Sequence, residues 1–267
     1  MIAIVADIHA NFPAFKAVLD DIRGKGIAEI VCLGDVVGYG PHPIECIDSA
    51  IENLSICIAG NHDKAVVQGE LDENYYNDFR DHAKKTIGWT RKQLKQLETR
   101  DNKRAQRYWE FLGSLPATKI DDKNRILFVH GSPRKPVREY IFPPGYLLYS
   151  LDTVKSIFEN YMDGIILCLV AHTHIPGVFT EDCSFSTPQQ LGYEFTLNSQ
   201  KAIVNVGSVG QPRNGDNRAS YVILNEKRIE FVGVEYDVDK TITDIYSTFG
   251  HNMKLAADLA ARLEEGR

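Results

Sequence analysis

Five short apolar segments of this 267-residue chain each end in side chains that can bind a metal ion. Residues 30–33, for example, form a run rich in β-branched side chains, followed by Gly34 and the carboxylate of Asp35. Such runs predict buried strands, and in open α/β sheets ligands collect at the carboxyl ends of the strands. The other four runs lead into Asp7-Ile8-His9, Gly60-Asn61-His62-Asp63, His130-Gly131 and Ala171-His172-Thr173-His174.

The spacing within these elements favours one shared site. In an extended Asp-x-His or His-x-His segment, the two polar side chains lie on the same face of the backbone. Both side chains can therefore contribute to one cluster of metal ligands. A single such element is weak evidence, because a lone histidine in a loop is usually a hydrogen-bonded structural residue. Five elements at five strand ends make coincidence a poor explanation.

The order of the predicted elements indicates one domain over residues 1–267, with two packed sheets and outer helices. Residues 1–62 alternate as β-α-β-α-β, which predicts parallel strands joined by right-handed crossovers. Two strands at about 117–121 and 125–130 flank a turn signal and predict a hairpin. After a strand at 165–170, the segment 176–234 predicts a second, largely antiparallel sheet. Outer helices are expected after Asn11, around 44–52, near 150–162 and over 241–266.

Residues 63–115 differ from the rest of the chain. They are charged and helical in period, with apolar contacts expected from Phe79, Ile87, Leu94 and Leu97. One interpretation is a solvated helical insertion. The other is a cap over the rim of the site that shapes substrate choice. The two interpretations are compatible.

Composition excludes several classes of function. Hydrophobic residues make up 43% and charged residues 25% of the chain, as in ordinary globular proteins. No apolar run approaches the roughly 18 residues of a membrane span, and the first residues do not resemble a signal peptide. Five cysteines without a CxxC pair favour a reducing cytoplasm. The formal charge of −6 argues against an extended nucleic-acid surface or an acidic membrane, but bound metal ions would still admit a small anionic substrate.

In this order, the blocks resemble the calcineurin-like metallophosphoesterase superfamily. Its pattern is D-x-H, G-D-x-x-G, G-N-H-[D/E], H and G-H-x-H, and all five blocks occur between Asp7 and His174, with Ala171 in place of the last glycine. Residues 34–41 and 207–213 are most similar to the small prokaryotic phosphoesterases of the superfamily. The resemblance implies a four-layer α/β/β/α sandwich of two mixed sheets flanked by helices. It also implies a single metallophosphoesterase domain, with a helical insertion at about 63–115.

The resemblance further implies two divalent metal ions. Asp35 would bridge both ions, the first would be held by Asp7, His9 and His174, and the second by Asn61, His130 and His172. A mixed oxygen and nitrogen ligand set without thiolates suits manganese, which we expect, and also iron, zinc, nickel or cobalt. Two such ions clamp a phosphate and activate a shared water, so that hydroxide attacks phosphorus and no protein nucleophile is needed.

Other residues receive roles in substrate binding and proton transfer. By resemblance, His62 would protonate the leaving oxygen, which suits a histidine that titrates near neutral pH. Asp63 could orient His62 or cap the following turn. Arg134, Arg138, Arg213 and Arg218 lie in Gly- and Pro-rich loops, and Arg213 followed by Arg134 are our candidates for binding phosphate oxygens. Asn205 and Ser208 could support the loops around the site.

One departure from the family pattern narrows the function. Protein serine/threonine phosphatases carry Asp-Arg-Gly after the bridging aspartate, whereas this chain has Gly38-Tyr39-Gly40. We therefore expect a phosphodiesterase or phosphomonoesterase acting on a small-molecule or nucleotide substrate. The alternatives are a non-catalytic protein-interaction module on the same fold, a nuclease and a protein phosphatase. The sequence does not indicate an oligomeric state.

Overall fold

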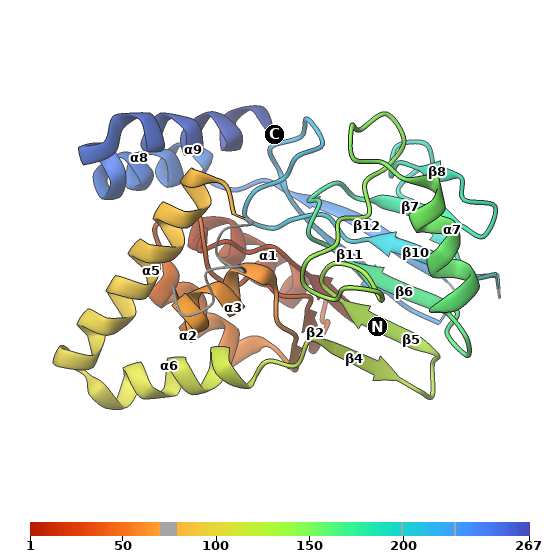
Figure 1. The fold of residues 1–267 in the computed structure, drawn as a ribbon, viewed down its shortest axis with the longest axis horizontal. Helices are drawn as coiled ribbons and strands as arrows, with labels where there is room; N and C mark the ends of the chain where they lie inside the picture. Colours follow the sequence, from red (N-terminus) through yellow and green to blue (C-terminus); the bar gives the residue numbers. More distant parts are fainter. Residues whose placement is uncertain (70–78, 199, 227) are drawn as a thin grey trace.

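Two mixed six-stranded sheets form the centre of the described part of the chain (Figure 1). The computed structural model describes residues 1–69, 79–198, 200–226 and 228–267. The first sheet has the strand order β3-β2-β1-β11-β12-β9, and the second has the order β4-β5-β6-β10-β7-β8. This arrangement confirms the predicted α/β class with two mixed sheets.

The first sheet begins with the predicted β-α-β-α-β unit. Strands β1, β2 and β3 pair in parallel, while β11, β12 and β9 add antiparallel neighbours. The strands are β1 (Ile2–Val5), β2 (Glu29–Cys32), β3 (Ile56–Cys57), β9 (Glu194–Thr196), β11 (Ala219–Leu224) and β12 (Arg228–Val234). Helices α1 (Phe12–Gly24) and α2 (Pro43–Asn53) make the crossovers. The Asn11 side chain accepts a hydrogen bond from the Ala14 amide, and this N-cap starts α1.

The second sheet contains the predicted hairpin and two parallel pairs. Strands β4 and β5 are antiparallel, whereas β5 pairs in parallel with β6, and β6 with β10. The strands are β4 (Thr118–Asp121), β5 (Ile126–Val129), β6 (Leu167–Val170), β7 (Gly177–Thr180), β8 (Phe185–Ser186) and β10 (Ala202–Asn205). The prediction that residues 176–234 form their own sheet is wrong. Their strands are divided between both sheets, because hydrophobic pattern identifies strands but not their pairing partners.

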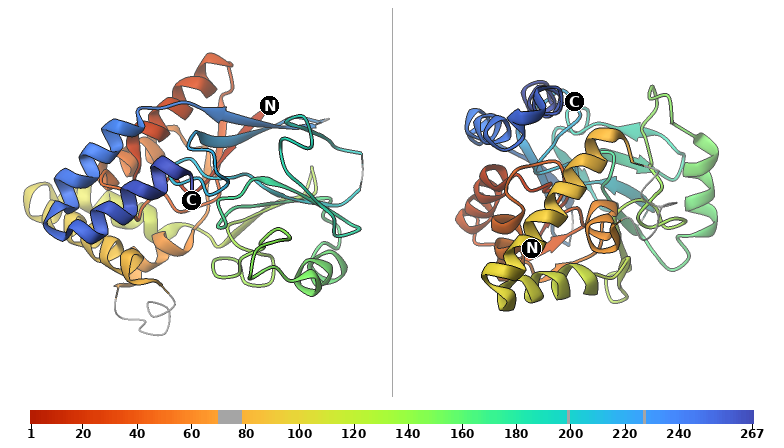
Figure 2. Two further views of the ribbon diagram at one scale, coloured as in Figure 1. Left: turned by 90° about the horizontal axis from the view of Figure 1, so that it is seen from above. Right: turned by 60° about the vertical axis from the view of Figure 1, so that its left-hand side comes forward.

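The pleat of each strand separates the apolar core into layers. Ile4 and Val31 of the first sheet face Phe128 and Leu169 of the second, and this cluster fills the space between the sheets. The outer face of the first sheet packs against α1 and α2. The outer face of the second sheet packs against α7 (Leu151–Asn160). The left view of Figure 2 shows the two sheets one above the other, which gives the expected α/β/β/α layers.

The segment expected to be a helical insertion contains three described helices, α3 (Asn61–Gln68), α5 (Asp81–Arg100) and α6 (Asn102–Ser114). Ile87 and Leu94 are fully buried against the first sheet's outer core, and Phe79 and Leu97 are partly buried there, as predicted. The part of this segment at residues 70–78 lies outside the described residues.

The C-terminal segment forms two helices rather than the single helix expected over 241–266. Helix α8 (Val238–Phe249) is followed by a short 3-10 turn, η2 (Gly250–Asn252), and by α9 (Met253–Glu265). The Asn252 side chain accepts a hydrogen bond from the Leu255 amide and so starts a new helix. The two helices pack together through Ile245 and Leu259. No helix in the described ranges is both long and apolar enough to cross a membrane.

The end of β2 and the start of α3 cross without space for side chains. A Cβ atom on Gly34 would lie 2.3 Å from the Gly60 amide nitrogen, and Gly34 has a φ of +97°. We therefore expect Gly34→Ala to lower the free energy of unfolding by about 2 kcal/mol or more, because both the contact and the backbone become strained. Urea titration measures this change. Gly24→Ala at the end of α1, where no atom lies within 4 Å, is the matched control and should be close to neutral. Equal stability of both variants would show that the close crossing is not required.

Candidate metal centre

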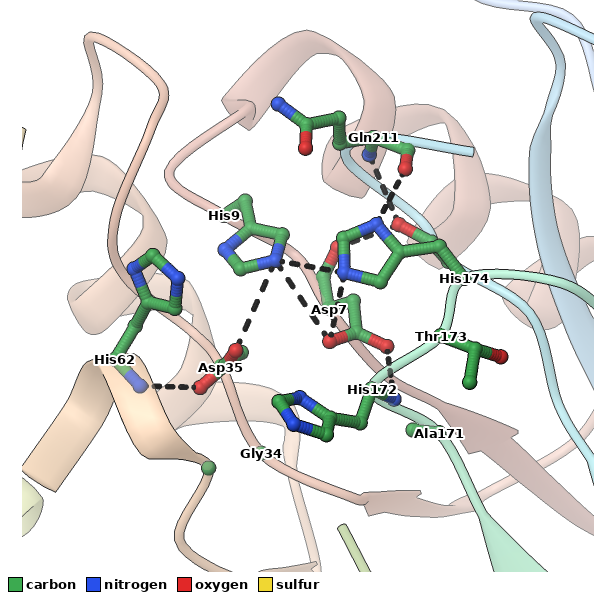
Figure 3. A network of polar contacts seen from close by, with 12 residues as sticks. Asp7, His9, Gly34, Asp35, His62, Ala171, His172, Thr173, His174 and Gln211 are labelled. Atoms are coloured by element: carbon green, nitrogen blue, oxygen red, sulfur yellow. Dashed lines mark hydrogen bonds and ion pairs between the residues drawn. The ribbon is translucent and has the colours of Figure 1, made fainter. Parts of the chain in front are cut away.

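All eight side chains predicted to bind metal or act in catalysis meet at one place. Figure 3 labels all of them except Asn61 and His130. They follow the carboxyl ends of β1, β2, β5 and β6 or lie in the first turn of α3. Each is at most 8% exposed, although each is polar: Asp7, His9, Asp35, Asn61, His62, His130, His172 and His174. Both sheets therefore contribute to one buried polar cluster.

The first group of candidate ligands consists of Asp7, His9 and His174. The Nε2 atoms of His9 and His174 are 3.1 Å apart. Asp7 Oδ1 lies 3.3 Å from His174 Nε2 and 3.7 Å from His9 Nε2. Three donor atoms thus converge on one point, as ligands of a single cation do.

The second group is built around His130. Its Nε2 atom lies 3.1 Å from His172 Nδ1 and 3.1 Å from Asn61 Oδ1. The same Nε2 atom is 3.4 Å from Asp35 Oδ2. This group can also surround a cation, with two nitrogen and two oxygen donors.

Asp35 lies between the two groups. Its Oδ2 atom is 3.7 Å from His9 Nε2 and 3.4 Å from His130 Nε2, so one carboxylate oxygen reaches both. Its Oδ1 atom accepts a hydrogen bond of 2.8 Å from the His62 amide, which fixes the carboxylate plane. A Cβ atom on Gly60 would lie 2.0 Å from Oδ1, so the approach requires glycine there.

The hydrogen bonds of three histidines determine which ring nitrogen faces the cluster. Nδ1 contacts a main-chain carbonyl oxygen in each: Val37 for His9, Leu33 for His130 and Gln211 for His174. A carbonyl only accepts, so Nδ1 carries the proton and Nε2 presents a lone pair to the cluster in the neutral ring. His9 and His174 thus direct two lone pairs at each other across 3.1 Å. A cation between them would turn this repulsion into attraction.

The backbone at several of these residues adopts the left-handed conformation, which is unfavourable for residues that carry a Cβ atom. The φ angles are +51° at Asp7, +48° at His9, +55° at Asp35, +66° at His172 and +62° at His174. Each left-handed non-glycine residue costs on the order of 1–3 kcal/mol and persists only when its surroundings enforce it. The strained positions coincide with five of the candidate ligands.

Neighbouring side chains hold the strained loops in place. Ser208 Oγ donates a hydrogen bond to the Asp7 carbonyl at 3.0 Å, and Asn205 Nδ2 donates to the Ala171 carbonyl at 2.8 Å. The His172 amide donates to Asp7 Oδ2 at 3.1 Å, which links the two sheets at the cluster. The supporting positions predicted for Asn205 and Ser208 are therefore confirmed.

Electrostatics makes the cluster unfavourable without a cation. Burial, and then the charges of Asp63 and Asp7, raise the pKa of Asp35 well above its usual value. Burial also raises the pKa of Asp7, but His174, His130 and the hydrogen bond from the His172 amide together outweigh this effect and leave the pKa lowered. Burial, followed by neighbouring histidines, holds the pKa of His9 and of His172 well below the usual value. The rings are therefore neutral, as ligands must be.

Unpartnered buried atoms also fit a cation site. Asp7 Oδ1 and His172 Nε2 have no hydrogen-bond partner, and they are among the few such buried side-chain atoms in the described residues. An unsatisfied buried acceptor costs about 1–3 kcal/mol. A divalent ion beside Asp7 Oδ1 would remove that cost, so the donor set fits the expected ions.

His62 stands beside the cluster, with its ring 4.8 Å from that of His9. Burial, followed by His174 and Arg213, holds the pKa of His62 well below its usual value, so the expected titration near neutral pH does not hold in this environment. A phosphate dianion beside the ring would raise that pKa again. In the described residues, Asp63 makes no hydrogen bond to the His62 ring. It accepts from the amides of Gly60 and Asp35 instead, which favours the capping role.

The candidate arginines have different surroundings. Arg213 lines a cavity of about 400 Å³ that opens on His62, and its Nη2 donates to Gln211 Oε1 at 2.7 Å. Arg134 does not line this cavity and is paired with Glu139 at 2.7 Å. Arg218 is likewise paired with Asp216. The structure thus supports the position expected for Arg213 but not that expected for Arg134.

Sequence reasoning missed several residues of this cavity. Tyr140 stacks on the His172 ring at a centroid distance of 3.6 Å, and Tyr39 packs within 4.7 Å of both His9 and His62. Arg80 and Arg262 also line the cavity, from the start of α5 and from α9. No motif marks Tyr140, Arg80 or Arg262, because they come from a loop and helices whose packing the sequence pattern does not reveal. Tyr39 belongs to the Gly38-Tyr39-Gly40 segment, but that segment did not predict its contacts with the two histidines.

Comparison with known proteins agrees with this geometry. A family model described as calcineurin-like phosphoesterase matches residues 1–176, which is more than half of the chain. This chain belongs to the calcineurin-like phosphoesterase family. The members of this family whose activity gives it its name hydrolyse phosphoesters, and the family's metal chemistry accounts for the buried clusters of histidine and aspartate.

Similarity to individual proteins extends over the whole chain. An uncharacterised protein of Methanocaldococcus jannaschii is 38% identical over 252 residues, covering 92% of this chain and 91% of that protein. A metallophosphoesterase of Sphaerobacter thermophilus is 34% identical, with a TM-score of 0.78 over 100% of this chain and 99% of that one. A hypothetical protein of Pyrococcus horikoshii is 23% identical with a TM-score of 0.73, over 100% and 99% of the two chains, and shares the fold.

The stacking of Tyr140 on His172 generates a testable prediction. His172 Nε2 has no hydrogen-bond partner, so stacking on Tyr140 orients this ring together with the contact between His172 Nδ1 and His130 Nε2. We expect Tyr140→Leu to weaken Mn²⁺ binding about tenfold or more, in the range found when supporting contacts of metal ligands are lost. Calorimetric titration of metal-stripped protein measures this change. Tyr140→Phe keeps the ring and should bind Mn²⁺ like the wild type. Unchanged affinity in the leucine variant would contradict an orienting role.

Proposed function

We propose that this protein is a dinuclear, divalent-metal-dependent hydrolase of phosphodiesters or phosphomonoesters, with a small-molecule or nucleotide substrate. One observation carries the proposal: buried histidine nitrogens and carboxylate oxygens converge in two adjacent groups that share Asp35. Asp35 would contact both ions, one ion would be held by Asp7, His9 and His174, and the other by Asn61, His130 and His172.

The donor set supports manganese as the ion, and iron, zinc, nickel and cobalt accept the same ligands. When bound, two such ions neutralise phosphate charge and lower the pKa of a water that they share. The chain supplies the remaining functions. Arg213 would bind a phosphate oxygen from the cavity side, and His62 would give a proton to the leaving oxygen. The proposal requires no nucleophile from the protein.

The residues around His62 favour a small substrate over a phosphoprotein. Gly38 and Tyr39 occupy the places where protein phosphatases carry the aspartate and the arginine of Asp-Arg-Gly, and Tyr39 packs against the rings of His9 and His62. Phe79, Arg80 and His82, at the start of α5, line the same cavity. We therefore propose that the segment 63–115 contributes to substrate choice as part of one domain. A complete set of ligands together with His62 supports catalysis over a role in protein binding alone.

Removal of metal provides the direct test. Protein stripped with a chelator should lose hydrolysis of bis-p-nitrophenyl phosphate, and Mn²⁺ should restore it. The reason is that the ions would supply the positive charge that the cluster of aspartates and histidines lacks. Release of p-nitrophenol is followed by its absorbance. Metal content is measured on the same samples. Hydrolysis that persists in protein shown to be free of metal would refute the proposal.

Two substitutions separate metal binding from proton transfer. Asp35→Asn should lose both bound metal and hydrolysis, because the shared anionic donor is gone. His62→Ala should retain metal but lose about 10²–10⁴-fold in kcat, the usual contribution of a general acid. Metal analysis and kinetics on the two variants together distinguish these outcomes. Full activity in either variant would rule out the role assigned to that residue.

A further inference from the structure

The cavity beside the candidate metal centre is larger than one phosphate requires. Its volume of about 400 Å³ falls in the range of sites that hold a whole small-molecule ligand. Asn61, His62 and His172 form its inner end at the metal centre. The remaining lining comes from other parts of the chain, so it is available to recognise what lies beyond the reacting phosphoryl group.

The charge of the lining is one-sided. Arg80, Arg138, Arg213 and Arg262 all line the cavity, and no aspartate or glutamate is found among its described lining residues. This concentration of guanidinium groups occurs in a chain whose formal net charge is −6. Guanidinium groups match phosphate oxygens in geometry and charge. Arg213 suffices for the reacting phosphoryl group, which leaves three arginines toward the outer end.

The pKa of His82 shows that Arg80, Arg213 and Arg262 act on the same space. Burial, followed by the charge of Arg262 and then those of Arg213 and Arg80, lowers the pKa of His82 to about 4, although Asp258 opposes this effect. Asp258 lies 3.5 Å from His82 Nδ1 and 3.4 Å from Arg262 Nε. Its carboxylate is 43% exposed, so water weakens the compensation it provides. The outer end of the cavity is therefore cationic.

Two aromatic residues of the cavity lining, Tyr140 and Phe142, are already stacked on other rings. Tyr140 is stacked between His172, at 3.6 Å, and Phe142, at 5.1 Å. Phe142 in turn stacks on Tyr146 at 5.7 Å. Because the ring faces are occupied within this stack, they offer little area for a planar base to stack on. The arginines, by contrast, can pair with an anion. Charge is the dominant recognition feature.

We propose that Arg80, Arg138 and Arg262 bind a second phosphoryl group of the substrate. This inference rests on the proposed function and names its substrate class: phosphoesters whose leaving group itself carries a phosphate. The metal centre would hold the reacting phosphoryl group, and the three arginines would hold the other. The recognition of a second anion would select such substrates over simple phosphoesters of the same size.

Non-hydrolysable ligands test the subsite independently of turnover. The probes are propane-, butane- and pentane-α,ω-bisphosphonate, each compared with the alkyl monophosphonate of equal length, titrated calorimetrically into Mn²⁺-loaded protein. At least one bisphosphonate should bind about tenfold or more tightly than its matched monophosphonate, as expected for added charge-assisted hydrogen bonds. Arg80→Gln and Arg262→Gln should each reduce this advantage, and the double variant should abolish it.

Lys254→Gln is the matched control, because it removes one positive charge from the same helix as Arg262 at a residue outside the cavity lining. It should keep the full bisphosphonate advantage. An advantage that came only from chelation of metal by the ligand would also persist in the arginine variants. Urea unfolding of each variant establishes that it is folded. Equal affinity for both ligand types in wild-type protein, or an advantage that survives in the double arginine variant, would overturn the subsite.

Hydrolysis of bis-p-nitrophenyl phosphate by the same wild-type preparation is measured separately. Hydrolysis without a bisphosphonate advantage refutes the second-phosphate subsite alone. A bisphosphonate advantage without hydrolysis refutes the proposed catalytic function and leaves the anion subsite in place. The two failures are therefore distinguishable.

Discussion

The structure depends on holding several electron-pair donors close together in a place that excludes water. His9 and His174 present Nε2 atoms to each other at 3.1 Å, and Asp35 brings a carboxylate oxygen to within 3.7 Å of His9. Without a cation this arrangement is repulsive and poorly solvated. The fold therefore stabilises a cluster that is unfavourable alone, which is the property of a preorganised metal centre.

The rest of the protein supplies that stabilisation in three ways. Main-chain carbonyls accept from the Nδ1 atoms of three histidines and so set which nitrogen faces inward. Asn205 at the end of β10 and Ser208 just beyond it donate hydrogen bonds to the Ala171 and Asp7 carbonyls and so brace the strained segments. The apolar layer between the two sheets keeps the carboxyl ends of their strands next to each other. Contacts throughout the core thus offset the large free-energy cost of placing a cation site in the interior.

The same architecture separates the reaction from recognition. The candidate ligands follow the strands of the central sheets or lie in the first turn of α3. The cavity above them is lined by residues from α5, α9 and the loops at 137–142 and 211–213. Within these outer elements, Tyr140 and the Gln211 carbonyl contact histidines of the candidate metal centre, whereas Arg80 and Arg262 line the cavity.

The sequence alone determined the parts of this protein that depend on local pattern. Apolar runs predicted the parallel β1, β2 and β3, and the residues that follow these runs predicted which side chains would meet, because strand ends of one sheet edge must converge. Tertiary structure alone decided the division of residues 176–234 between both sheets, the capping role of Asp63, and the loss of Arg134 to an ion pair with Glu139. It also brought Tyr140, Arg80 and Arg262 to the cavity. The physical reason is range: strand and ligand patterns are read over a few residues, whereas strand pairing, burial and charge pairing depend on contacts between residues far apart in the chain.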